Sequence, residues 1–479
     1  MKQQALRRAK IVATIGPASQ APEQLQALIE AGMDVARLNF SHGSHADHTA
    51  VIGHIRRIGR ALGRPVAILQ DLQGPKIRLG ELVGGTVELA VGAAFCLTTE
   101  EVEGDGQRAW VSYAALARDV QAGDEILLSD GLLRLRVEKV EAPQVYCRVV
   151  DGGRLRPRAG INLPGVALSV PALTDKDRDD LQFGMDQGVD FVALSFVRAA
   201  ADIVHLKEIM ATAGADIPVV AKIEKPEALA ALDEILQAAD GVMVARGDLG
   251  VEVSPERVPF VQKRIIQRAF RYKIPVITAT QMLESMIEQP RPTRAEASDV
   301  ANAVFDGTDA VMLSGETAIG VNPVGVVQMM DRIVRAAESD MTYHRGRPEN
   351  DHQETPASFP DAVAEAACSV AVDIGARAII AFTQSGFTAR LISKYRPPVP
   401  IISITSSALL EPRLCLFWGV APKCIELVDQ VDELIGRVEA QLLDAGAVAT
   451  GDALVILAGS PMGQTGTTNL MKLHRVGEK

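Results

Sequence analysis

The chain has 479 residues and a mass of 51.1 kDa, about three times the ~150 residues of a typical domain, so several domains or a large barrel with attachments are expected. Hydrophobic residues make up 47% and charged residues 23%, which provides a core for each domain and excludes global disorder. The formal charge of −11 disfavours nucleic acid as a partner, because its phosphate backbone is also negative.

The five cysteines (Cys96, Cys147, Cys368, Cys415 and Cys424) form no CxxC or CxxxxC pair, which argues against a disulfide framework and against a zinc site. The apolar run at residues 11–15 ends at Gly16-Pro17 and is too short for a signal peptide, and no other run is long enough for a membrane span. These features predict a cytoplasmic protein without a membrane partner.

Eight short apolar runs rich in β-branched residues each end in polar residues or glycine; they lie at residues 10–16, 35–43, 66–74, 191–197, 219–225, 241–250, 275–281 and 310–316. Between most of them, apolar residues recur at helical spacing, at 23–31, 175–187, 200–213, 226–238, 255–272 and 293–305. Alternating strands and helices predict parallel pairing, because parallel strands need a crossover. We therefore expect an α/β protein built on a (β/α)8 TIM barrel, with its chemistry at the carboxyl ends of the strands.

The interval at about residues 74–170 breaks this alternation. It is rich in Val, Leu and Gly, alternates along 132–140, and carries turn signals at Gly84-Gly85, Asp130-Gly131 and 151–153. This pattern predicts a β-rich domain inserted after the third barrel strand, where it can act as a lid.

The polar stretch at residues 343–360 is interpreted as a linker to a separate α/β domain. In that domain we expect helices at 362–373 and 389–394, strands at 378–382 and 401–405, and a final strand at 453–458. The predicted division is therefore 1–73 for the first part of the barrel, 74–170 for the lid, 171–345 for the second part of the barrel and 346–479 for a C-terminal α/β regulatory domain.

Polar residues cluster at the predicted strand ends. Arg37, Asn39 and Ser41 are two apart, so on a strand they project from one face. An Arg facing a barrel interior is costly unless it is paired, which leaves a ligand-facing strand end or a satisfied structural network as the two interpretations.

Lys222 and Glu224 repeat this spacing on the fifth predicted strand, and Asp248 follows Gly247 at the end of the sixth. Two carboxylates on adjacent strand ends suit Mg²⁺, which keeps waters and shares oxygens with its substrate. A neighbouring ammonium favours an anionic substrate. The alternative is an ordinary Lys-x-Glu salt bridge.

The triplet His42, His45 and His48 suggests a metal site. However, residues spaced three apart do not stay on one face of a helix, and no fixed carboxylate completes a site. The glycine-rich loop at residues 459–466 lacks the Lys of a P-loop, so a kinase with this sequence must hold nucleotide phosphates differently.

The sequence resembles the pyruvate kinase family. The resemblance is carried by residues 36–43 (ARLNFSHG), 71–78 (DLQGPKIR), 161–165 (INLPG), 221–227 (AKIEKPE), 243–252 (MVARGDLGVE), 278–284 (TATQMLE) and 312–317 (MLSGET), in the order of the family. It implies transfer of the phosphoryl group of phosphoenolpyruvate to ADP, giving pyruvate and ATP in the last step of glycolysis.

The resemblance also implies roles for residues. Lys222, Arg37, Arg78 and Thr280 are expected to be catalytic, and Glu224 and Asp248 to hold Mg²⁺, or Mn²⁺ in its place. Arg37, Lys222, Gly247, Asp248 and Thr280 are expected to bind substrate, with the backbone N–H groups of Gly247 and Asp248 facing its carboxylate. Asn39, His42 and Arg78 are expected to bind the nucleotide. A hydroxyl is a poor acid, so a water chain ending at Thr280 is preferred as the proton donor to the enolate.

Two departures from the family pattern stand out. Many members have a Lys before the INLPG run that reaches the nucleotide, whereas this chain has Ala159, with Arg156 and Arg158 nearby as alternative substitutes. K⁺-dependent relatives have Glu at the position of Lys76 and Thr at that of Leu72, near Asn39, Ser41 and Asp71. The Lys76 ammonium can replace the ion, so the chain resembles the K⁺-independent subgroup and K⁺ is not expected to be required.

The segment Thr383, Gln384, Ser385, Gly386, Phe387 and Thr388 opens a predicted helix and resembles the family's effector-phosphate segment. The alternative is plain N-capping by Ser385 or Thr388. Phe387 stands where a basic residue is expected, and residues 459–466 carry no Lys or Arg, so we expect one phosphate to bind. This predicts activation by a sugar monophosphate or AMP in a homotetramer that only the family implies.

Two other functions stay open at this stage. A divalent-metal lyase of the wider phosphoenolpyruvate and pyruvate barrel group would share Glu224 and Asp248, but has no use for Arg78, Lys222 and a lid together. An inactive sugar-phosphate sensor would need only the C-terminal domain, and the intact charged site positions disfavour it.

Overall fold

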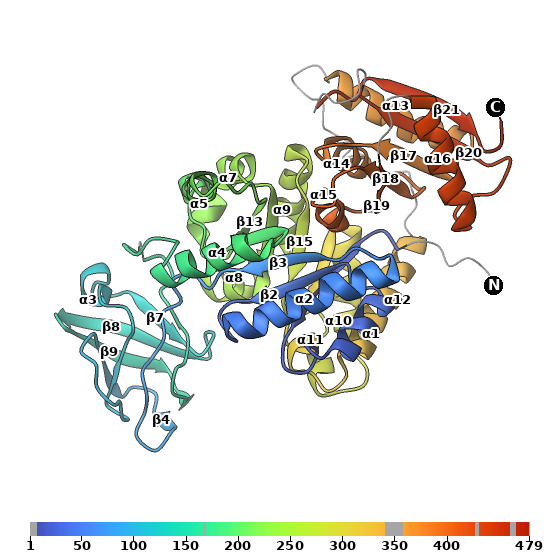
Figure 1. Ribbon diagram of the computed structural model, residues 1–479. Coiled ribbons are helices and arrows are strands. Elements are labelled where there is room, and N and C mark those ends of the chain that lie inside the picture. The colour runs from blue at the N-terminus through green and yellow to red at the C-terminus, as the bar shows by residue number, and fades with distance from the viewer. Residues whose placement is uncertain (1–6, 167, 341–357, 427–430, 460–465, 479) are drawn as a thin grey trace.

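Eight parallel strands form the centre of the molecule, which we describe from a computed structural model at residues 7–166, 168–340, 358–426, 431–459 and 466–478 (Figure 1). The strands are β1 (Lys10–Ile15), β2 (Val35–Asn39), β3 (Ala67–Asp71), β12 (Phe191–Leu194), β13 (Val219–Ile223), β14 (Gly241–Ala245), β15 (Val276–Ala279) and β16 (Ala310–Leu313). They close in the order β1-β16-β15-β14-β13-β12-β3-β2. The predicted TIM barrel is confirmed, and its nearly continuous apolar strands fit a sheet that is buried on both faces.

Helices surround the barrel: α1 (Pro22–Ala31), α2 (His45–Leu62), α4 (Asp175–Gln187), α5 (Ala200–Thr212), α6 (Pro226–Ala230), α7 (Leu232–Ala238), α8 (Arg246–Glu252), α9 (Val258–Tyr272), α10 (Arg294–Phe305), α11 (Gly315–Ala318) and α12 (Pro323–Asp340). Short 3₁₀ turns lie at Pro255–Arg257 and Glu284–Ile287. Capping boxes begin α2, α4 and α10, where a hydroxyl and a carboxylate satisfy the free backbone N–H groups of the first turn.

Several predicted bounds were wrong. Six of the eight runs end in loops, whereas the residues after Ala245 begin α8 and Gly315 begins α11. β2 ends at Asn39, so Ser41 does not share a strand face with Arg37. The predicted helix at 226–238 is broken at Ala231, and the one at 255–272 starts with a 3₁₀ turn.

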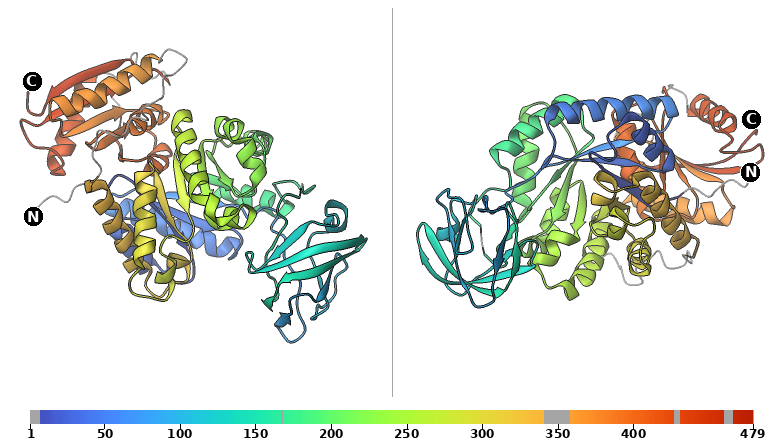
Figure 2. Two further views of the ribbon diagram at one scale, coloured as in Figure 1. Left: turned by 180° about the vertical axis from the view of Figure 1, so that it is seen from behind. Right: turned by 90° about the horizontal axis from the view of Figure 1, so that it is seen from below.

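An inserted domain, which we define as β4 to β11, lies between β3 and α4 and projects from one end of the barrel (Figures 1 and 2). Its elements are β4 (Val87–Leu89), β5 (Ala94–Thr98), β6 (Arg108–Trp110), α3 (Leu116–Asp119), β7 (Glu125–Leu128), β8 (Leu133–Glu141), β9 (Gln144–Asp151), β10 (Gly153–Leu155) and β11 (Ile161–Asn162). Six strands form one sheet in the order β11-β7-β8-β9-β5-β6. The sheet has its own apolar core around Phe95, Leu97 and Leu135.

The C-terminal domain lies at the opposite end of the barrel (Figures 1 and 2). It consists of α13 (Phe359–Asp373), β17 (Ala378–Phe382), α14 (Phe387–Lys394), β18 (Ile401–Thr405), α15 (Leu410–Arg413), a 3₁₀ turn at Leu414–Leu416, β19 (Val420–Cys424), α16 (Val431–Asp444), β20 (Ala453–Ala458) and β21 (Leu470–Arg475). The sheet order is β19-β18-β17-β20-β21, and β21 is antiparallel to β20.

The C-terminal predictions need two corrections. β20 is not the final strand, because β21 follows it. Residues Phe359 and Pro360, which were assigned to the linker, begin α13 after a Ser358 cap. The remaining linker residues up to 357 and the predicted boundary at 345 lie outside the described residues. The other domain boundaries stay predictions.

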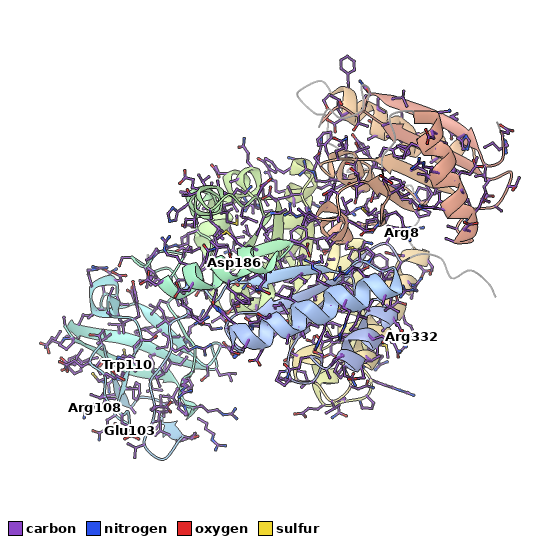
Figure 3. All side chains as sticks on the ribbon, viewed as in Figure 1. Arg8, Glu103, Arg108, Trp110, Asp186 and Arg332 are labelled. Atoms are coloured by element: carbon purple, nitrogen blue, oxygen red, sulfur yellow. The ribbon has the colours of Figure 1, made fainter. Side chains whose placement is uncertain are left out.

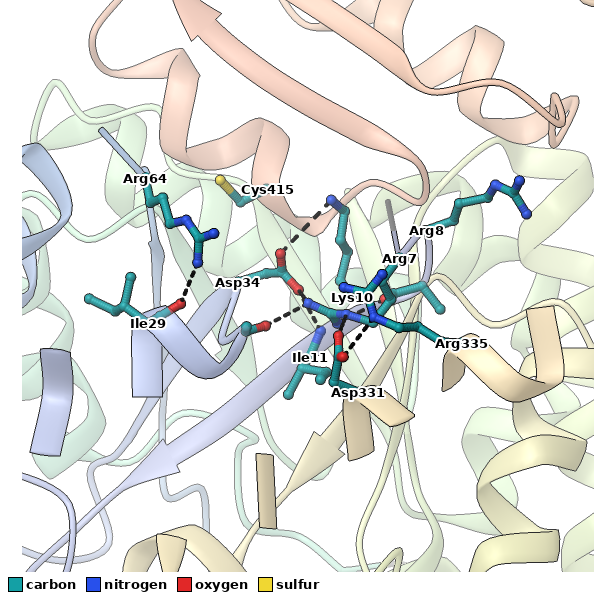
Figure 4. Close-up of polar contacts among 12 residues, drawn as sticks. Arg7, Arg8, Lys10, Ile11, Ile29, Asp34, Arg64, Asp331, Arg335 and Cys415 are labelled. Carbon is teal, nitrogen blue, oxygen red and sulfur yellow. Dashed lines mark hydrogen bonds and ion pairs between the residues drawn. The ribbon is translucent and has the colours of Figure 1, made fainter. Parts of the chain in front are cut away.

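The C-terminal domain closes the amino end of the barrel. Leu416 and Cys415 pack with inward-facing barrel residues such as Leu69 and Met243. Beside Cys415 and Leu416, Arg7 forms ion pairs with Asp34 at 2.7 Å and with Asp331 at 3.0 Å. These side chains converge near the start of strand β1 (Figure 4). The amino end is therefore filled and fixed, which leaves the carboxyl end for chemistry.

Candidate active site

The predicted site residues on the strands meet at the carboxyl end of the barrel, because all its strands run in parallel. Arg37 lies near the end of β2, Asp71 ends β3, and Lys222 lies near the end of β13. Glu224 follows β13 directly, and Asp248 lies in the first turn of α8. This arrangement brings two cationic and three carboxylate side chains to one mouth, below the inserted domain.

Asp71 links the two cations. Its carboxylate accepts a hydrogen bond from Arg37 Nε at 2.7 Å, and its other oxygen lies 3.2 Å from Lys222 Nζ. Burial opposes the charge on Asp71, but Lys222 and Arg37 outweigh it and lower the pKa of the carboxyl group. Asp71 therefore stays ionised and holds both cations at the site.

Lys222 is buried within a ring of acceptors. Its Nζ lies 2.9 Å from Glu224 Oε1 and donates to Ser195 Oγ at 2.6 Å. Burial opposes its charge, but Asp71 and Glu224 outweigh it and raise the pKa of Lys222. The ammonium is thus a permanent positive charge at a desolvated position, which suits neutralisation of a transferring phosphoryl group.

Glu224 is almost fully buried, and its Oε2 accepts the backbone N–H of Phe196 at 2.8 Å. Burial raises the pKa of Glu224, with Lys222 opposing and Asp248 adding to the shift. Asp248 lies in the first turn of α8, after the neighbouring strand β14, so the two carboxylates stand at the ends of adjacent strands. Such a pair gains from a divalent cation between its members, so this donor set fits Mg²⁺ that completes its coordination with water and substrate oxygens.

Lys76 lies beside the expected metal ligand. Its Nζ is 3.6 Å from Asp248 Oδ1, and both side chains are 31% exposed. The described contacts of Asp71 are with Arg37, Lys222 and Ser195 and do not include Lys76. Leu72 is buried and bound through its backbone, so its side chain offers nothing to an ion.

Thr280 and Gly247 are bonded to one another. Gly247 N–H donates to Thr280 Oγ1 at 2.8 Å, and Thr280 Oγ1 donates to the Ala279 carbonyl at 2.6 Å. Thr280 has a φ of 69°, a left-handed conformation that is uncommon for a β-branched residue. The N–H that was expected to face a substrate carboxylate thus has an internal partner, and Thr280 is held close to Gly247.

The loop after β2 carries the expected nucleotide residues. Ser41 N–H donates to Asn39 Oδ1 at 3.2 Å, which keeps Ser41 close to the strand end it has left. Burial lowers the pKa of His42, and Arg78, Arg37 and Lys76 lower it further. These three cations are therefore close enough to His42 to disfavour the charged form of its imidazole.

His45 and His48 have other partners. His45 Nε2 is 2.7 Å from Asp180 Oδ1, and His48 Nε2 is 3.1 Å from the His42 carbonyl. His48 also stacks on Phe40, with 4.2 Å between ring centroids. Within the described part of the chain, no group of three His, Cys, Asp or Glu residues is placed to hold a metal ion.

The two candidate arginines of the inserted domain differ. Arg158 Nε donates to Glu81 Oε1 at 2.6 Å on an exposed surface, and its carbonyl accepts from Arg78 Nη1 at 3.4 Å. Arg156 is exposed as well. Neither is brought to Lys222 or Glu224 by a described contact.

The candidate effector segment lies at the far end of the molecule from the inserted domain. Gly386, with a φ of 84°, is the N-cap of α14, and no side chain makes a capping hydrogen bond. Thr388 Oγ1 instead bonds Thr468 Oγ1 at 2.7 Å. Gln384 and Ser385 are exposed. Because neither Ser385 nor Thr388 caps α14, the alternative of plain N-capping is wrong.

Sequence reasoning missed Ser195, Phe196 and Thr14. Ser195 bonds Lys222, Phe196 N–H bonds Glu224, and Thr14 Oγ1 accepts from Arg37 Nη1 at 3.0 Å. Ser195 and Phe196 directly follow strand β12, where barrel residues face the ligand. That position was the available signal.

Comparison with known proteins gives a consistent result. The family model described as the pyruvate kinase barrel domain matches residues 6–327, and the pyruvate kinase alpha/beta domain matches residues 361–474. The chain is 47% identical over 472 residues to a pyruvate kinase of Mycobacterium intracellulare, covering 98% of this chain and 99% of that protein.

Two further relatives extend the similarity. A pyruvate kinase of Geobacillus stearothermophilus is 46% identical over 475 residues, covering 98% of this chain and 81% of that protein. The crystal structure of a pyruvate kinase from Cryptosporidium parvum has a TM-score of 0.91 and 38% identity, covering 98% of this chain and 96% of that one. Among the described helices, none is long and apolar enough to cross a membrane.

Proposed function

Because this chain belongs to the pyruvate kinase family of phosphotransferases, we propose that it transfers the phosphoryl group of phosphoenolpyruvate to ADP at the carboxyl end of the barrel. The observation that carries this assignment of the site is Lys222, whose buried ammonium touches Asp71, Glu224 and Ser195. Phosphoryl transfer needs positioned cations more than covalent chemistry, and this mouth supplies them.

The charge of each residue determines its proposed role. Lys222 neutralises the phosphoryl group in flight, and Arg37 and Arg78 hold its oxygens. Asp71 keeps Arg37 and Lys222 in place. The backbone N–H groups of Gly247 and Asp248 donate to the substrate carboxylate, which takes the place of Thr280 Oγ1 as the acceptor of the Gly247 N–H. Thr280 is then placed beside the carbon that accepts a proton through water.

The family generally uses a divalent metal, and we propose that Glu224 and Asp248 hold Mg²⁺, or Mn²⁺ in its place. When bound, the ion offsets negative charge that develops on the enolate oxygen. Phe196 N–H restrains the second oxygen of Glu224, so that Oε1 stays directed at the site.

Asn39, His42 and Arg78 are proposed to bind the nucleotide. Their support is the cationic environment of His42, which receives the fields of Arg78, Arg37 and Lys76. We also propose that the inserted domain closes over the substrates, because its first strand connection carries Lys76 and Arg78 to the site.

K⁺ is proposed to be unnecessary. The Lys76 ammonium lies at the edge of the site, 3.6 Å from Asp248, and supplies a fixed positive charge there. Activity in K⁺-free buffer should rise little on adding K⁺, whereas Lys76→Glu should lower activity and create a K⁺ response. A large K⁺ activation of the unaltered protein would contradict this.

Control is proposed through Thr383, Gln384, Ser385, Gly386, Phe387 and Thr388, with one phosphate of a sugar monophosphate or AMP. Its support is the start of helix α14, where the N-cap is Gly386 and no side chain makes a capping hydrogen bond, so the first backbone N–H groups are not capped by a side chain. A homotetramer in the cytoplasm completes this proposal, and the exposed Met471 and Leu473 on the edge strand β21 fit contact with another subunit.

The direct test is a coupled assay with phosphoenolpyruvate, ADP and Mg²⁺, in which pyruvate is followed by reduction to lactate. We expect turnover that depends on all three components. Phosphoenolpyruvate saturation curves with glucose 6-phosphate, ribose 5-phosphate, AMP or fructose 1,6-bisphosphate test the effector, and a shift with the bisphosphate alone would refute the single-phosphate argument.

A further inference from the structure

One short segment, Ser195 to Arg198, contacts both the catalytic centre and the inserted domain. It follows β12 and precedes α5 (Ala200–Thr212). Its backbone is held in an unusual conformation, since Phe196 has a φ of 56°. This strained segment touches both the catalytic centre and the inserted domain, so it can transmit a change from one to the other; the role assigned to it rests on the proposed function.

On the side of the catalytic centre, the segment binds Lys222, which lies in β13, and Glu224, which directly follows β13. Ser195 Oγ accepts from Lys222 Nζ at 2.6 Å and donates to the Leu72 carbonyl at 2.7 Å. Phe196 N–H donates to Glu224 Oε2 at 2.8 Å. A shift of this segment therefore changes the positions of Lys222 and Glu224 directly.

Toward the inserted domain, Arg198 holds the returning connection of the chain. Its Nη1 donates to the Leu168 carbonyl at 2.5 Å, and its Nη2 donates to the Val170 carbonyl at 2.7 Å. The fork of a guanidinium reaches the two carbonyls from two separate nitrogens, whereas a lysine would have to reach both from a single nitrogen. Arg198 itself is fixed at the start of α5, because its N–H donates to Asp202 at 2.9 Å.

Ser169, which lies between Leu168 and Val170, binds the inserted domain instead of Arg198. Ser169 N–H donates to Asp119 Oδ2 at 2.9 Å, and Ser169 Oγ donates to Asp119 Oδ1 at 2.7 Å. Asp119 ends α3 of the inserted domain. Successive residues of the returning connection are thus bound alternately to the barrel and to the inserted domain.

The outgoing connection meets the same segment. Gly74 has a φ of 67°, and a Cβ placed on it would lie 2.8 Å from the Phe196 ring. The Gly74 N–H also donates to Asp177 Oδ1 at 3.0 Å. Both connections of the inserted domain therefore lie against Ser195 to Arg198, and a cleft at this junction is lined by Lys76, Asn162, Leu168, Phe196 and Arg198.

We propose that Arg198 is a positioning residue that couples the orientation of the inserted domain to the placement of Lys222 and Glu224. It acts through the two carbonyls on one side and through Phe196 and Ser195 on the other. Closure over the nucleotide then depends on the contact of Arg198 with the returning connection, and this contact involves neither substrate.

The experiment compares Arg198→Met and Arg198→Lys with Arg178→Met in the full-length protein. Arg178 is an exposed arginine on α4 that contacts His205 and neither connection. Spin labels on non-natural residues at Glu103, in the inserted domain, and at Arg332, on α12, report the distance between the two bodies (Figure 3). Steady-state kinetics with ADP and phosphoenolpyruvate are measured on the same variants without labels.

We expect Arg198→Met to broaden the distance distribution and to lower kcat/KM for ADP by about tenfold to a hundredfold, as small misplacements do. The kcat should fall as well, because Lys222 and Glu224 are displaced, whereas KM for phosphoenolpyruvate should change less, because Arg37 holds that substrate from β2 and has no described contact with Ser195 to Arg198. Arg198→Lys should be intermediate, and Arg178→Met should match the unaltered protein.

Unchanged distances and kinetics in Arg198→Met would overturn the proposal, as would a kinetic loss without any change in distance. If Arg198→Met does not fold, the same two readouts on Arg198→Lys decide. Absence of turnover in the unaltered protein would refute the proposed function. In that case the distance distribution of Arg198→Met would still show whether Arg198 sets the orientation of the inserted domain.

Discussion

At the scale of single residues, the site depends on Asp71, which binds Arg37 Nε and lies 3.2 Å from Lys222 Nζ. The strand pattern predicted that Arg37, Lys222, Glu224 and Asp248 gather, because all parallel strands end at one face. It could not show that Asp71 joins the cations or that Thr280 takes the Gly247 N–H, since these pairings depend on side-chain directions across neighbouring elements.

Asp71→Asn should lower kcat by about a hundredfold, the size of effect seen when one preorganised charge contact is lost. The amide keeps the shape but removes the charge that raises the pKa of Lys222, and it leaves Arg37 without its ion pair. Steady-state kinetics on the purified variant measure this.

The matched control for this change is Asp190→Asn. Asp190 is also a buried carboxylate, but it precedes β12 at the amino end of the barrel and pairs with Arg56 at 2.8 Å. It should lower the thermal midpoint and leave kcat of the folded protein nearly unchanged. A kcat of Asp71→Asn within twofold of the unaltered protein would remove Asp71 from the account.

At the scale of elements, helix α4 fixes the base of the inserted domain. Its first turn contains Asp177, whose Oδ2 accepts from Thr174 N–H at 2.9 Å and from Thr174 Oγ1 at 2.6 Å. Its Oδ1 accepts from Gly74 N–H, on the other connection of the domain. The bounds of α4 were predicted from periodicity, but the bond to Gly74 joins residues 103 positions apart and has no local signature.

Asp177→Asn should destabilise the protein by about 2–3 kcal/mol, because a fully buried charged acceptor of three hydrogen bonds is replaced by a neutral one. Asp47→Asn makes the same change in the exposed capping box of α2 and should cost clearly less, because water can solvate the groups that it leaves. Denaturant unfolding measures both values, and equal losses would show that Asp177 acts only as a cap.

At the scale of the whole molecule, the barrel lies between the inserted domain and the C-terminal domain (Figure 2). The C-terminal domain is anchored at Asp309, which accepts from Lys394 Nζ at 2.6 Å and from Arg396 Nη1 at 3.0 Å. Composition and alternation predicted this order of domains. They could not predict the anchor, because its charges come from segments 85 and 87 residues apart and look like ordinary surface residues.

Asp309→Asn should cost about 3–5 kcal/mol, the usual loss when one partner of a buried ion pair is removed. The sign of the pH effect follows from its pKa. Burial opposes ionisation, but Arg396 and Lys394 outweigh it and lower the pKa of Asp309 below its ordinary value of 3.8. Its stabilisation is therefore complete above about pH 5, where the unfolded carboxyl is also ionised, and is lost as pH falls through the lowered value.

Thermal unfolding between pH 3 and pH 7 tests this prediction. The unaltered protein should exceed Asp309→Asn in midpoint by a gap that is constant above about pH 5 and shrinks toward pH 3. A gap that grows as pH falls would contradict the assigned direction.

The central claim is that Lys222 neutralises the phosphoryl group on its way from phosphoenolpyruvate to ADP. Its direct test is the kcat of Lys222→Met in the coupled assay, beside Lys207→Met, which removes a surface lysine paired with Asp240 at 2.7 Å. We predict a loss of at least about a thousandfold for Lys222→Met and no change for Lys207→Met. A folded Lys222→Met protein within tenfold of the unaltered kcat would contradict the mechanism.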